Sequence, residues 1–217
     1  MTRVKVDPQR RIEIGRERRA RTRAKIVAAA FDLFGEQNGL FLRVEDIAER
    51  AGITRATFYD HFHGMAELRE AVSYELTHDF LTAVTHGVSS LEDPRERAAA
   101  ATRFYLERVR HDPRWGWSMI NLSASGIPFG DETHRQAAQT VREGMEAGQL
   151  TIADSAIGRD IVLGTALAAI GTMLREKKAD DYVAAVVEAV LLGLGVAATE
   201  AAEIARRPLP PLTLSSS

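Results

Sequence analysis

Apolar residues recur at intervals of three and four along almost the whole chain, and few folds are compatible with that spacing. Ile26, Ala30 and Leu33 share one helical face, and Val183, Val187 and Val190 share another. No stretch of useful length alternates apolar and polar residues with the period of two that is typical of a half-buried strand. The sequence therefore predicts an all-α fold.

Capping and breaking residues divide this pattern into helices. Thr22 is expected to cap a first helix, which Asn38-Gly39 ends with residues that tolerate positive φ, and Gly52 is expected to end a second helix that begins near Val44. Further helices are expected over residues 55–62, 65–86, 94–111, 115–123, 131–147, 154–177 and 181–207. The resulting domain prediction is a basic N-terminal arm over 1–20, a three-helix head over 21–64, a helical body over 65–207 and a flexible tail over 208–217.

Positive charge is concentrated at the N-terminus. Residues 1–25 hold ten Lys or Arg against three acidic residues, although the whole chain has a net charge of −2. The remainder holds 18 basic and 27 acidic residues. A basic end on an otherwise acidic protein is typical of a chain whose end meets a polyanion such as DNA, but a solvated basic tail produces the same pattern.

The stretch GITRATFYDHF, residues 52–62, has the composition of a recognition helix. Thr54 is expected to cap it, and Phe58 and Phe62 are spaced so that both face inward. Its outward face then carries Arg55, Thr57, Tyr59 and His61. Arg can donate two hydrogen bonds to guanine and Thr can contact a thymine methyl, so the two helices joined at Gly52 indicate a DNA-binding helix-turn-helix. The alternative is a plain surface helix with solvated polar residues.

Residues 22–68 resemble the DNA-binding head of the TetR family of transcriptional regulators. The resemblance rests on the run IAERAGITRATFYDHF, together with Thr22, Ile26, Ala29-Ala30, Leu33-Phe34, Val44 and Leu68. It implies that Arg55, Ala56 and Thr57 face bases, that Tyr59 and His61 hold phosphates, and that Thr54 lies at the same interface. It also implies a dimeric protein, and a repressor that a small molecule releases from a near-palindromic operator.

Two residues depart from the family pattern, and the basic arm could compensate. Met65 stands where the family commonly has Lys, which puts one phosphate contact in doubt. Arg43 stands where the family commonly has Ser or Thr; it caps a helix less well but can still reach a phosphate. Arg21 and Arg23, with Arg16, Arg18 and Arg19, are expected to reach along the DNA backbone or into a minor groove.

The middle of the chain gathers aromatic residues where the TetR resemblance implies an effector pocket. We expect an apolar or aromatic lining with a few polar groups, although each residue could equally belong to an ordinary core. The candidate ligand-binding residues are Phe104, Trp115, Trp117, Met119, Asn121, Phe129 and His134.

The segment Gly193-Leu-Gly195-Val-Ala-Ala198 fits the G-x-G-x-x-A dinucleotide fingerprint, but that motif requires a preceding strand and an acidic residue about twenty positions later. Here the spacing of Val183, Val187 and Val190 predicts a helix that continues through the glycines. Small residues in that helix would let two helices approach closely. The last two helices are too apolar for one small domain and therefore indicate a homodimer formed through them.

We find no catalytic constellation, and we expect no metal site and no cofactor. The chain has no cysteine, no phosphate-binding loop and no HExxH motif. The longest uncharged apolar stretch, 161–174, is too short to span a bilayer, and no apolar run follows the N-terminal charges, so we expect a cytoplasmic protein. The alternative function is a ligand-binding helical protein or enzyme without specific DNA binding.

Overall fold

The computed structural model describes residues 8–123 and 129–213, and its described residues are helical with no strand. The fold class is therefore all-α, as predicted. The elements, in chain order, are α1 (Pro8–Phe34), the 3-10 turn η1 (Gly39–Phe41), α2 (Val44–Ala51), α3 (Arg55–Tyr59), α4 (Met65–Val88), α5 (Pro94–His111), α6 (Pro113–Leu122), α7 (Gly130–Glu146), α8 (Ser155–Arg175), α9 (Tyr182–Gly193) and α10 (Ala198–Ile204).

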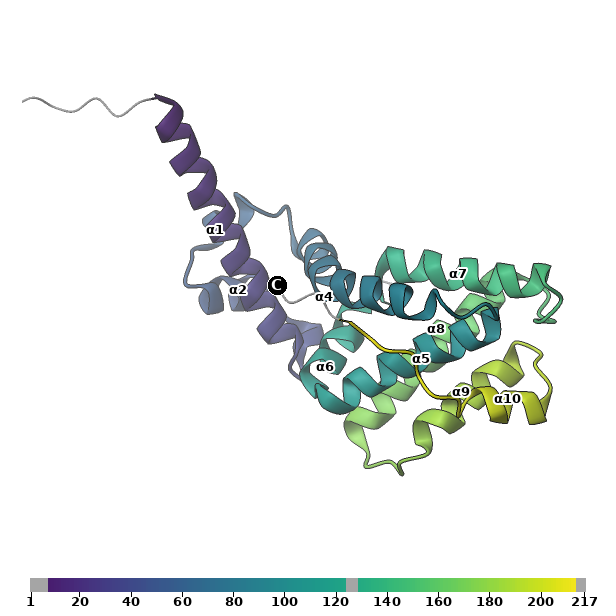
Figure 1. The fold of residues 1–217 in the computed structure, drawn as a ribbon. Helices are drawn as coiled ribbons and strands as arrows, with labels where there is room; N and C mark the ends of the chain where they lie inside the picture. Colours follow the sequence, from purple (N-terminus) through teal and green to yellow (C-terminus); the bar gives the residue numbers. More distant parts are fainter. Residues whose placement is uncertain (1–7, 124–128, 214–217) are drawn as a thin grey trace, which may run out of the picture.

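Figure 1 shows a small head and a larger body, with α4 running from one into the other. The head consists of α1, α2 and α3, in which α2 contacts both α1 and α3. In the body, α5 contacts α4, α6, α7, α8, α9 and α10. The head meets the body where α1 contacts α4 and α6 and where η1 contacts α6.

Side-chain caps set several helix starts. The Asp93 carboxylate accepts a hydrogen bond from the backbone N–H of Arg95 at 2.8 Å, and Pro94 occupies the first turn of α5. Asp154 caps α8 in the same way, accepting from the N–H of Ala156 at 2.7 Å. These caps satisfy backbone donors that the first turn of a helix leaves without partners.

The start of α1 differs from the prediction. The helix begins at Pro8, and the Thr22 hydroxyl does not cap it but donates to the carbonyl oxygen of Arg18 one turn earlier, at 3.0 Å. The described part of the expected basic arm, residues 8–20, is therefore helical. Proline suits the first turn of a helix, and the Arg-rich sequence that follows has good helix propensity.

Glycines explain two further differences. At Gly39 an added Cβ would lie 2.7 Å from the Asn121 Nδ2 atom, so this glycine is required by close packing and not by the positive φ that we expected. At Gly195 φ is +87°, which separates α9 from α10. The prediction of one helix through these glycines is wrong, but a helix and not a strand precedes them, so the dinucleotide fingerprint does not apply.

The start of the tail packs on the body. The side chains of Leu209 and Leu212 lie against the core, and the Arg103 guanidinium donates to the carbonyl oxygen of Arg207. Residues 208–213 thus differ from the flexible tail that proline and serine predicted, because two leucines find an apolar surface. Residues 214–217 lie outside the described residues.

Among the described residues, α8 is the one helix long and apolar enough to cross a membrane by length and composition. The sequence prediction considered only residues 161–174, whereas the helix has 21 residues and begins at Ser155. It packs against α5, α6, α7 and α9, which is the position of a core helix in a helical domain.

Candidate nucleic-acid interface and ligand cavity

Local hydrogen bonds fix the orientation of α3. Gly52 ends α2 in the left-handed conformation at φ 64°, which glycine adopts without strain. Two residues later the Thr54 hydroxyl accepts from the backbone N–H of Thr57 at 3.1 Å, as predicted for the cap. Phe58 and Phe62 are fully buried with ring centroids 5.8 Å apart, and they hold α3 against the head.

The opposite face of α3 is open to solvent. Arg55, Ala56 and Tyr59 are exposed, and Thr57 is half-buried with its hydroxyl 3.0 Å from that of Thr54. Arg55 contacts the Glu45 carboxylate at 2.9 Å, and a hydrogen bond with the side chain of Tyr59, together with the charge of Glu45, raises the pKa of Arg55. These exposed groups include an Arg fork, a methyl and a phenol, which suit base edges and phosphates.

Helix α1 lies beside the end of α3. The Arg19 guanidinium donates to the carbonyl oxygen of Asp60 at 2.7 Å, and the Arg23 guanidinium lies 4.2 Å from the centroid of the Phe62 ring. Arg23 is thus held against the head, whereas Arg21 is exposed. Burial, and then the charge of Arg19, lowers the pKa of His61, so its imidazole is neutral at pH 7 and can donate one N–H.

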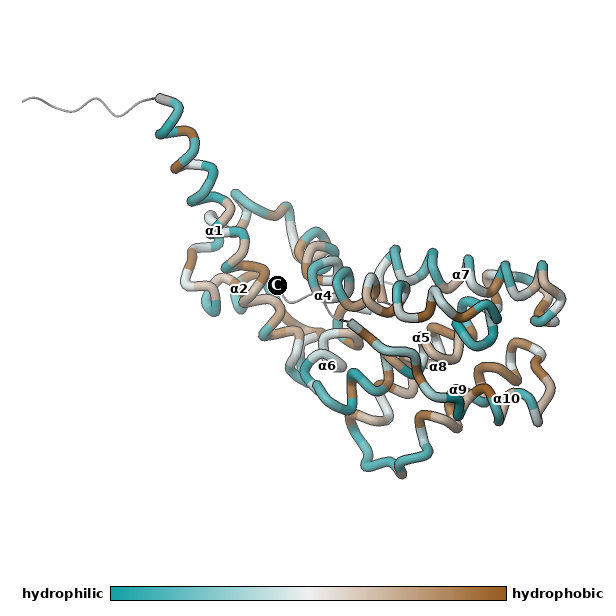
Figure 2. The backbone as a smooth tube through the Cα atoms, in the orientation of Figure 1, coloured by the Kyte–Doolittle hydropathy of each residue, from teal (hydrophilic) through white to brown (hydrophobic). Residues whose placement is uncertain are grey.

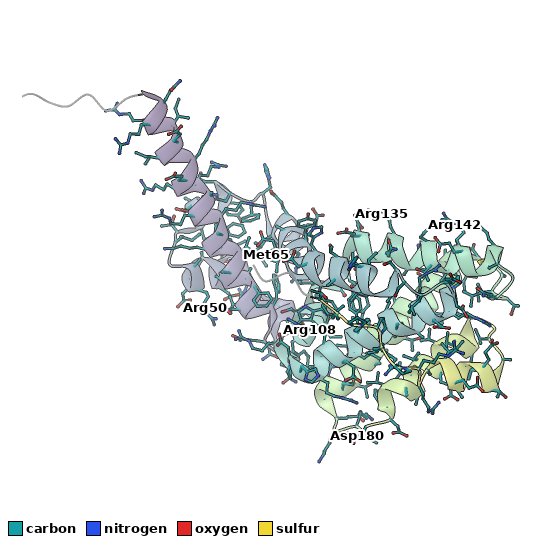
Figure 3. All side chains as sticks on the ribbon, viewed as in Figure 1. Arg50, Met65, Arg108, Arg135, Arg142 and Asp180 are labelled. Atoms are coloured by element: carbon teal, nitrogen blue, oxygen red, sulfur yellow. The ribbon has the colours of Figure 1, made fainter. Side chains whose placement is uncertain are left out.

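The two residues that depart from the family pattern lie at helix starts. Arg43 precedes α2 with an exposed side chain, and its backbone N–H donates to the Asp46 carboxylate at 2.7 Å. This leaves the Arg43 guanidinium free to extend outward. Met65 begins α4 and packs on the core, at the junction of head and body in Figure 3. The Met65 side chain therefore supplies no charge to this face.

A cavity of about 160 Å³ lies in the body between α4, α5, α7 and α8. Its apolar wall includes Leu81, Val84, Val88, Ala98, Ala101, Phe129, Val141, Val162, Leu163 and Ala166. Its polar groups come from Thr85, Ser89, Arg97, Thr102, Tyr105, Thr133, Gln136 and Thr140. The space suits a small, largely apolar molecule with few hydrogen-bonding groups.

The one charged group among the described residues of this wall, and several of its polar groups, are already partnered. The Tyr105 hydroxyl lies 3.2 Å from the Thr133 hydroxyl, and burial raises the pKa of Tyr105 to about 12. Arg97 pairs with the Glu143 carboxylate and donates to the carbonyl oxygens of Leu91 and Glu92 at 3.0 Å. The cavity therefore favours a neutral ligand, because it offers no uncompensated charge.

The predicted ligand-binding residues are distributed more widely than expected. Phe129 lines the cavity, and the buried Trp115 lies one layer behind it, with its ring centroid 5.8 Å from that of Tyr105. Met119 and Phe104 are buried in the core but do not line the cavity, and the half-buried His134 on α7 does not line it either.

Trp117 and Asn121 have structural positions outside the cavity. The Trp117 ring lies 5.0 Å from the Arg175 guanidinium. Asn121, only 2% exposed, donates from its amide nitrogen to the carbonyl oxygens of Phe34 and Glu36, each at 2.8 Å. These two bonds tie α6 of the body to the end of α1 in the head.

Sequence reasoning missed most of the polar cavity residues, although a signal was present. Thr133, Gln136 and Thr140 recur at three and four along α7, so one face of this amphipathic helix carries hydroxyl and amide groups. Thr102 similarly lies one turn before Tyr105 on α5. Polar groups of modest size on an inward helical face indicate a cavity that is not purely apolar.

Comparisons with known proteins agree with both parts of the structure. Residues 26–72 match the family described as bacterial regulatory proteins, tetR family, and residues 93–207 match the tetracyclin repressor-like C-terminal domain. The ligand-bound structure of RolR in complex with resorcinol is similar to this chain, with a TM-score of 0.75 and 30% sequence identity, covering 91% of this chain and 99% of RolR.

Two curated relatives are also transcriptional regulators. The HTH-type transcriptional activator FasR of Mycolicibacterium smegmatis is 26% identical over 98 residues, which are 45% of this chain and 44% of FasR. The probable HTH-type transcriptional regulator ArpR of Pseudomonas putida is 37% identical over 79 residues, 36% of this chain and 38% of ArpR. The matched part thus spans less than half of the length of either relative. Together with the two family matches, these findings show that the chain belongs to the TetR family of transcriptional regulators, with an N-terminal helix-turn-helix region and a tetracyclin repressor-like C-terminal domain.

Proposed function

We propose that the protein is a homodimeric repressor that binds a near-palindromic operator and is released by a small apolar or aromatic effector. The observation that carries the proposal is the exposed face of α3, where Arg55, Ala56 and Tyr59 surround Thr57 on a helix held rigidly by two buried phenylalanines. Binding to DNA places the protein in the cytoplasm.

Contacts to DNA follow from the position of each side chain. Arg55, Ala56 and Thr57 read base edges in the major groove, with Thr54 beside them. To do so, the Arg55 guanidinium gives up its ion pair with Glu45. Tyr59 and His61 bind phosphates at the far end of α3, and Arg43 and Arg21 extend the phosphate contacts on either side. Two copies of α3 related by a two-fold axis would enter successive major grooves about 34–36 Å apart.

The dimer is proposed to form through α8 and α9. Ile157 on α8 is 50% exposed and Leu192 on α9 is 44% exposed, which are large apolar side chains left in water by a single copy. Gly164 on α8 has open space around its α-carbon, and Gly193 on α9 lies close to the Ile161 side chain of α8. A second copy packed on this surface would form a four-helix interface and bury both apolar residues.

Release by an effector requires the cavity to communicate with the head. Tyr105 in the cavity wall packs on Trp115 in the first turn of α6. Near the other end of α6, the amide of Asn121 holds the end of α1. An effector that fits better when α6 has shifted would move the head and weaken operator binding. The coupling free energy equals its preference for the shifted state, typically about 1–3 kcal/mol.

Two relatives inform the nature and the sign of the response. RolR binds resorcinol, and a small neutral phenol also suits the size and neutral lining of the cavity here. FasR, by contrast, is named an activator. Transcription with purified polymerase distinguishes the two roles, because an activator raises the amount of transcript and a repressor lowers it. A repressor lowers transcription from its operator until effector is added.

Selection of operator sequences from random duplexes by the purified protein tests the proposal. We expect a near-palindromic sequence, protected as two half-sites in a footprint, and a dimer by light scattering. A panel of small phenols would then include compounds that release the duplex and raise the melting temperature. A ligand-binding helical protein without specific DNA binding would yield no enriched sequence while still binding a compound of the panel.

A further inference from the structure

The first turns of α1 stand clear of the core. Residues 9–21 are exposed, and the helix has its first fully buried side chain only at Ile26. Ile12 and Ile14 are 57% and 52% exposed, and a Cβ added at Gly15 would meet nothing within 4 Å. Figure 1 shows this part of α1 projecting beyond the head, and the colours of Figure 2 show that most of its residues are hydrophilic.

This projecting helix carries concentrated positive charge. Residues 8–25 hold eight Arg or Lys against Glu13 and Glu17, and none of these basic side chains pairs with a carboxylate of the described residues. Like charges three and four residues apart on a helix repel one another. A helix of a few turns without packing is also marginal in water. A polyanion that neutralises the arginines would therefore stabilise it.

The end of the projecting segment that joins the head lies beside the proposed DNA surface. The Arg19 guanidinium donates a hydrogen bond to the carbonyl oxygen of Asp60, the residue that follows α3, at 2.7 Å. From Arg19 back to Pro8 the helix extends about 16 Å at 1.5 Å per residue. Its arginines thus lie beyond the end of α3 that carries Tyr59, where DNA bound by α3 would continue.

The shape of the segment decides how it can meet a duplex. An α-helix with its side chains is about 10–12 Å across, whereas the minor groove of B-DNA is about 6 Å wide. A helical segment therefore does not enter the minor groove, which was one of the two routes expected for an extended arm. The phosphate ridges remain accessible to arginines from the side of a helix.

We propose that residues 8–21 form a helix that follows the phosphate backbone of the DNA flanking each half-site. This inference rests on the proposed function, because it requires α3 to lie in a major groove. It adds a contact region outside the operator sequence, in which affinity depends on duplex length and on salt but not on base sequence.

Duplex length provides the test. The full-length protein is titrated by fluorescence anisotropy, with competitor DNA, onto a selected operator that ends at its half-sites and onto the same operator with ten further base pairs of arbitrary sequence on each side. We expect the longer duplex to bind on the order of tenfold more tightly at about 0.15 M salt, with a steeper salt dependence of about 0.9 in logarithmic slope for each added phosphate contact.

Two charge variants locate the contact. Arg10→Gln with Arg11→Gln, at two exposed residues far from the head, should remove most of the gain from the longer duplex and leave binding to the shorter duplex unchanged. The control changes two exposed arginines of the body, Arg135→Gln with Arg142→Gln, which lie on α7 in Figure 3 and far from the head. The control variant should retain the full gain in affinity, because it loses the same two positive charges but at positions away from the flanking DNA.

Gly15 tests whether the helix is needed. Gly15→Pro interrupts the helix and keeps every charge, and Gly15→Ala favours the helix. We expect the proline variant to lose the gain and the alanine variant to keep it. Equal binding of wild type to both duplexes, or a proline variant that keeps the gain, would overturn this inference and leave the operator assignment standing. Failure to select any operator would instead refute the proposed function.

Discussion

Replacing Asn121 tests how the head is held on the body. Its amide donates to two carbonyl oxygens at 2.8 Å, and for the Phe34 oxygen no other protein donor is recorded among the described residues. Asn121→Ala removes both bonds, at about 1 kcal/mol each, and leaves a buried acceptor without a partner, at about 1–3 kcal/mol. We therefore expect a loss of about 3–5 kcal/mol in the free energy of unfolding.

Asn121→Asp should be worse than alanine at pH 7. A carboxylate of the same shape would face two carbonyl oxygens, so burial and these dipoles raise its pKa above the unfolded value of about 3.9. A carboxyl group whose pKa is raised by folding destabilises the folded state at pH values where the carboxyl is ionised. This penalty disappears as the pH falls and the acid becomes protonated. The deficit relative to wild type should thus shrink between pH 7 and pH 4.

Urea denaturation measures these differences, with Asn38→Ala as the control. Asn38 is the other asparagine of the chain, its side chain is exposed, and its loss should change the free energy of unfolding by less than about 0.5 kcal/mol. Asn121→Ala could instead change the free energy of unfolding as little as the control, or the aspartate variant could show no pH dependence relative to wild type. Either result would mean that these hydrogen bonds do not hold the head, and it would contradict the proposed coupling from the cavity through α6 to the head.

Three further predictions concern single side chains. The pKa of His61 is low in the free protein, and a DNA phosphate beside the imidazole should raise it. Operator affinity should therefore increase as the pH falls from 7.5 to 6 in anisotropy titrations, and His61→Gln should abolish this dependence. Thr133→Val leaves the buried Tyr105 hydroxyl without its partner and should lower the free energy of unfolding by about 1–3 kcal/mol; no change would show that the hydroxyl is otherwise satisfied. Gly195→Ala forces a methyl group onto the Thr151 hydroxyl at a positive φ and should lower the melting temperature clearly, whereas an unchanged value would argue against this turn.

Much of the fold could be predicted because periodicity and caps act locally. Gly52 and Thr54 end one helix and begin the next with interactions inside a few residues, and these boundaries were predicted correctly. Gly195 could not be interpreted in this way, because its neighbours Leu194 and Val196 continue an apolar pattern that hides the turn. The course of residues 208–213 depends on contacts with distant helices, and no local pattern predicts such contacts.

The two sites differ in how far the sequence predicts them. The exposed face of α3 follows from a single helix, so Arg55, Thr57 and Tyr59 could be grouped from spacing alone. The cavity is formed by four helices, and its lining depends on how they pack. Trp115 and Met119 therefore seemed suitable by residue type, yet α6 directs them into the core, while threonines of α5 and α7 reach the space.

The most direct test of the account compares wild type with Thr57→Ala combined with Tyr59→Ala on a selected operator, by fluorescence anisotropy with excess competitor DNA across a salt series. Thr57 is half-buried and Tyr59 is exposed, so the variant should fold and dimerise normally. We predict that it loses specific binding by at least one to two orders of magnitude while wild-type binding survives the competitor and falls steeply with salt. A folded, dimeric variant that keeps full operator affinity would contradict the assignment of α3 as the helix that reads DNA.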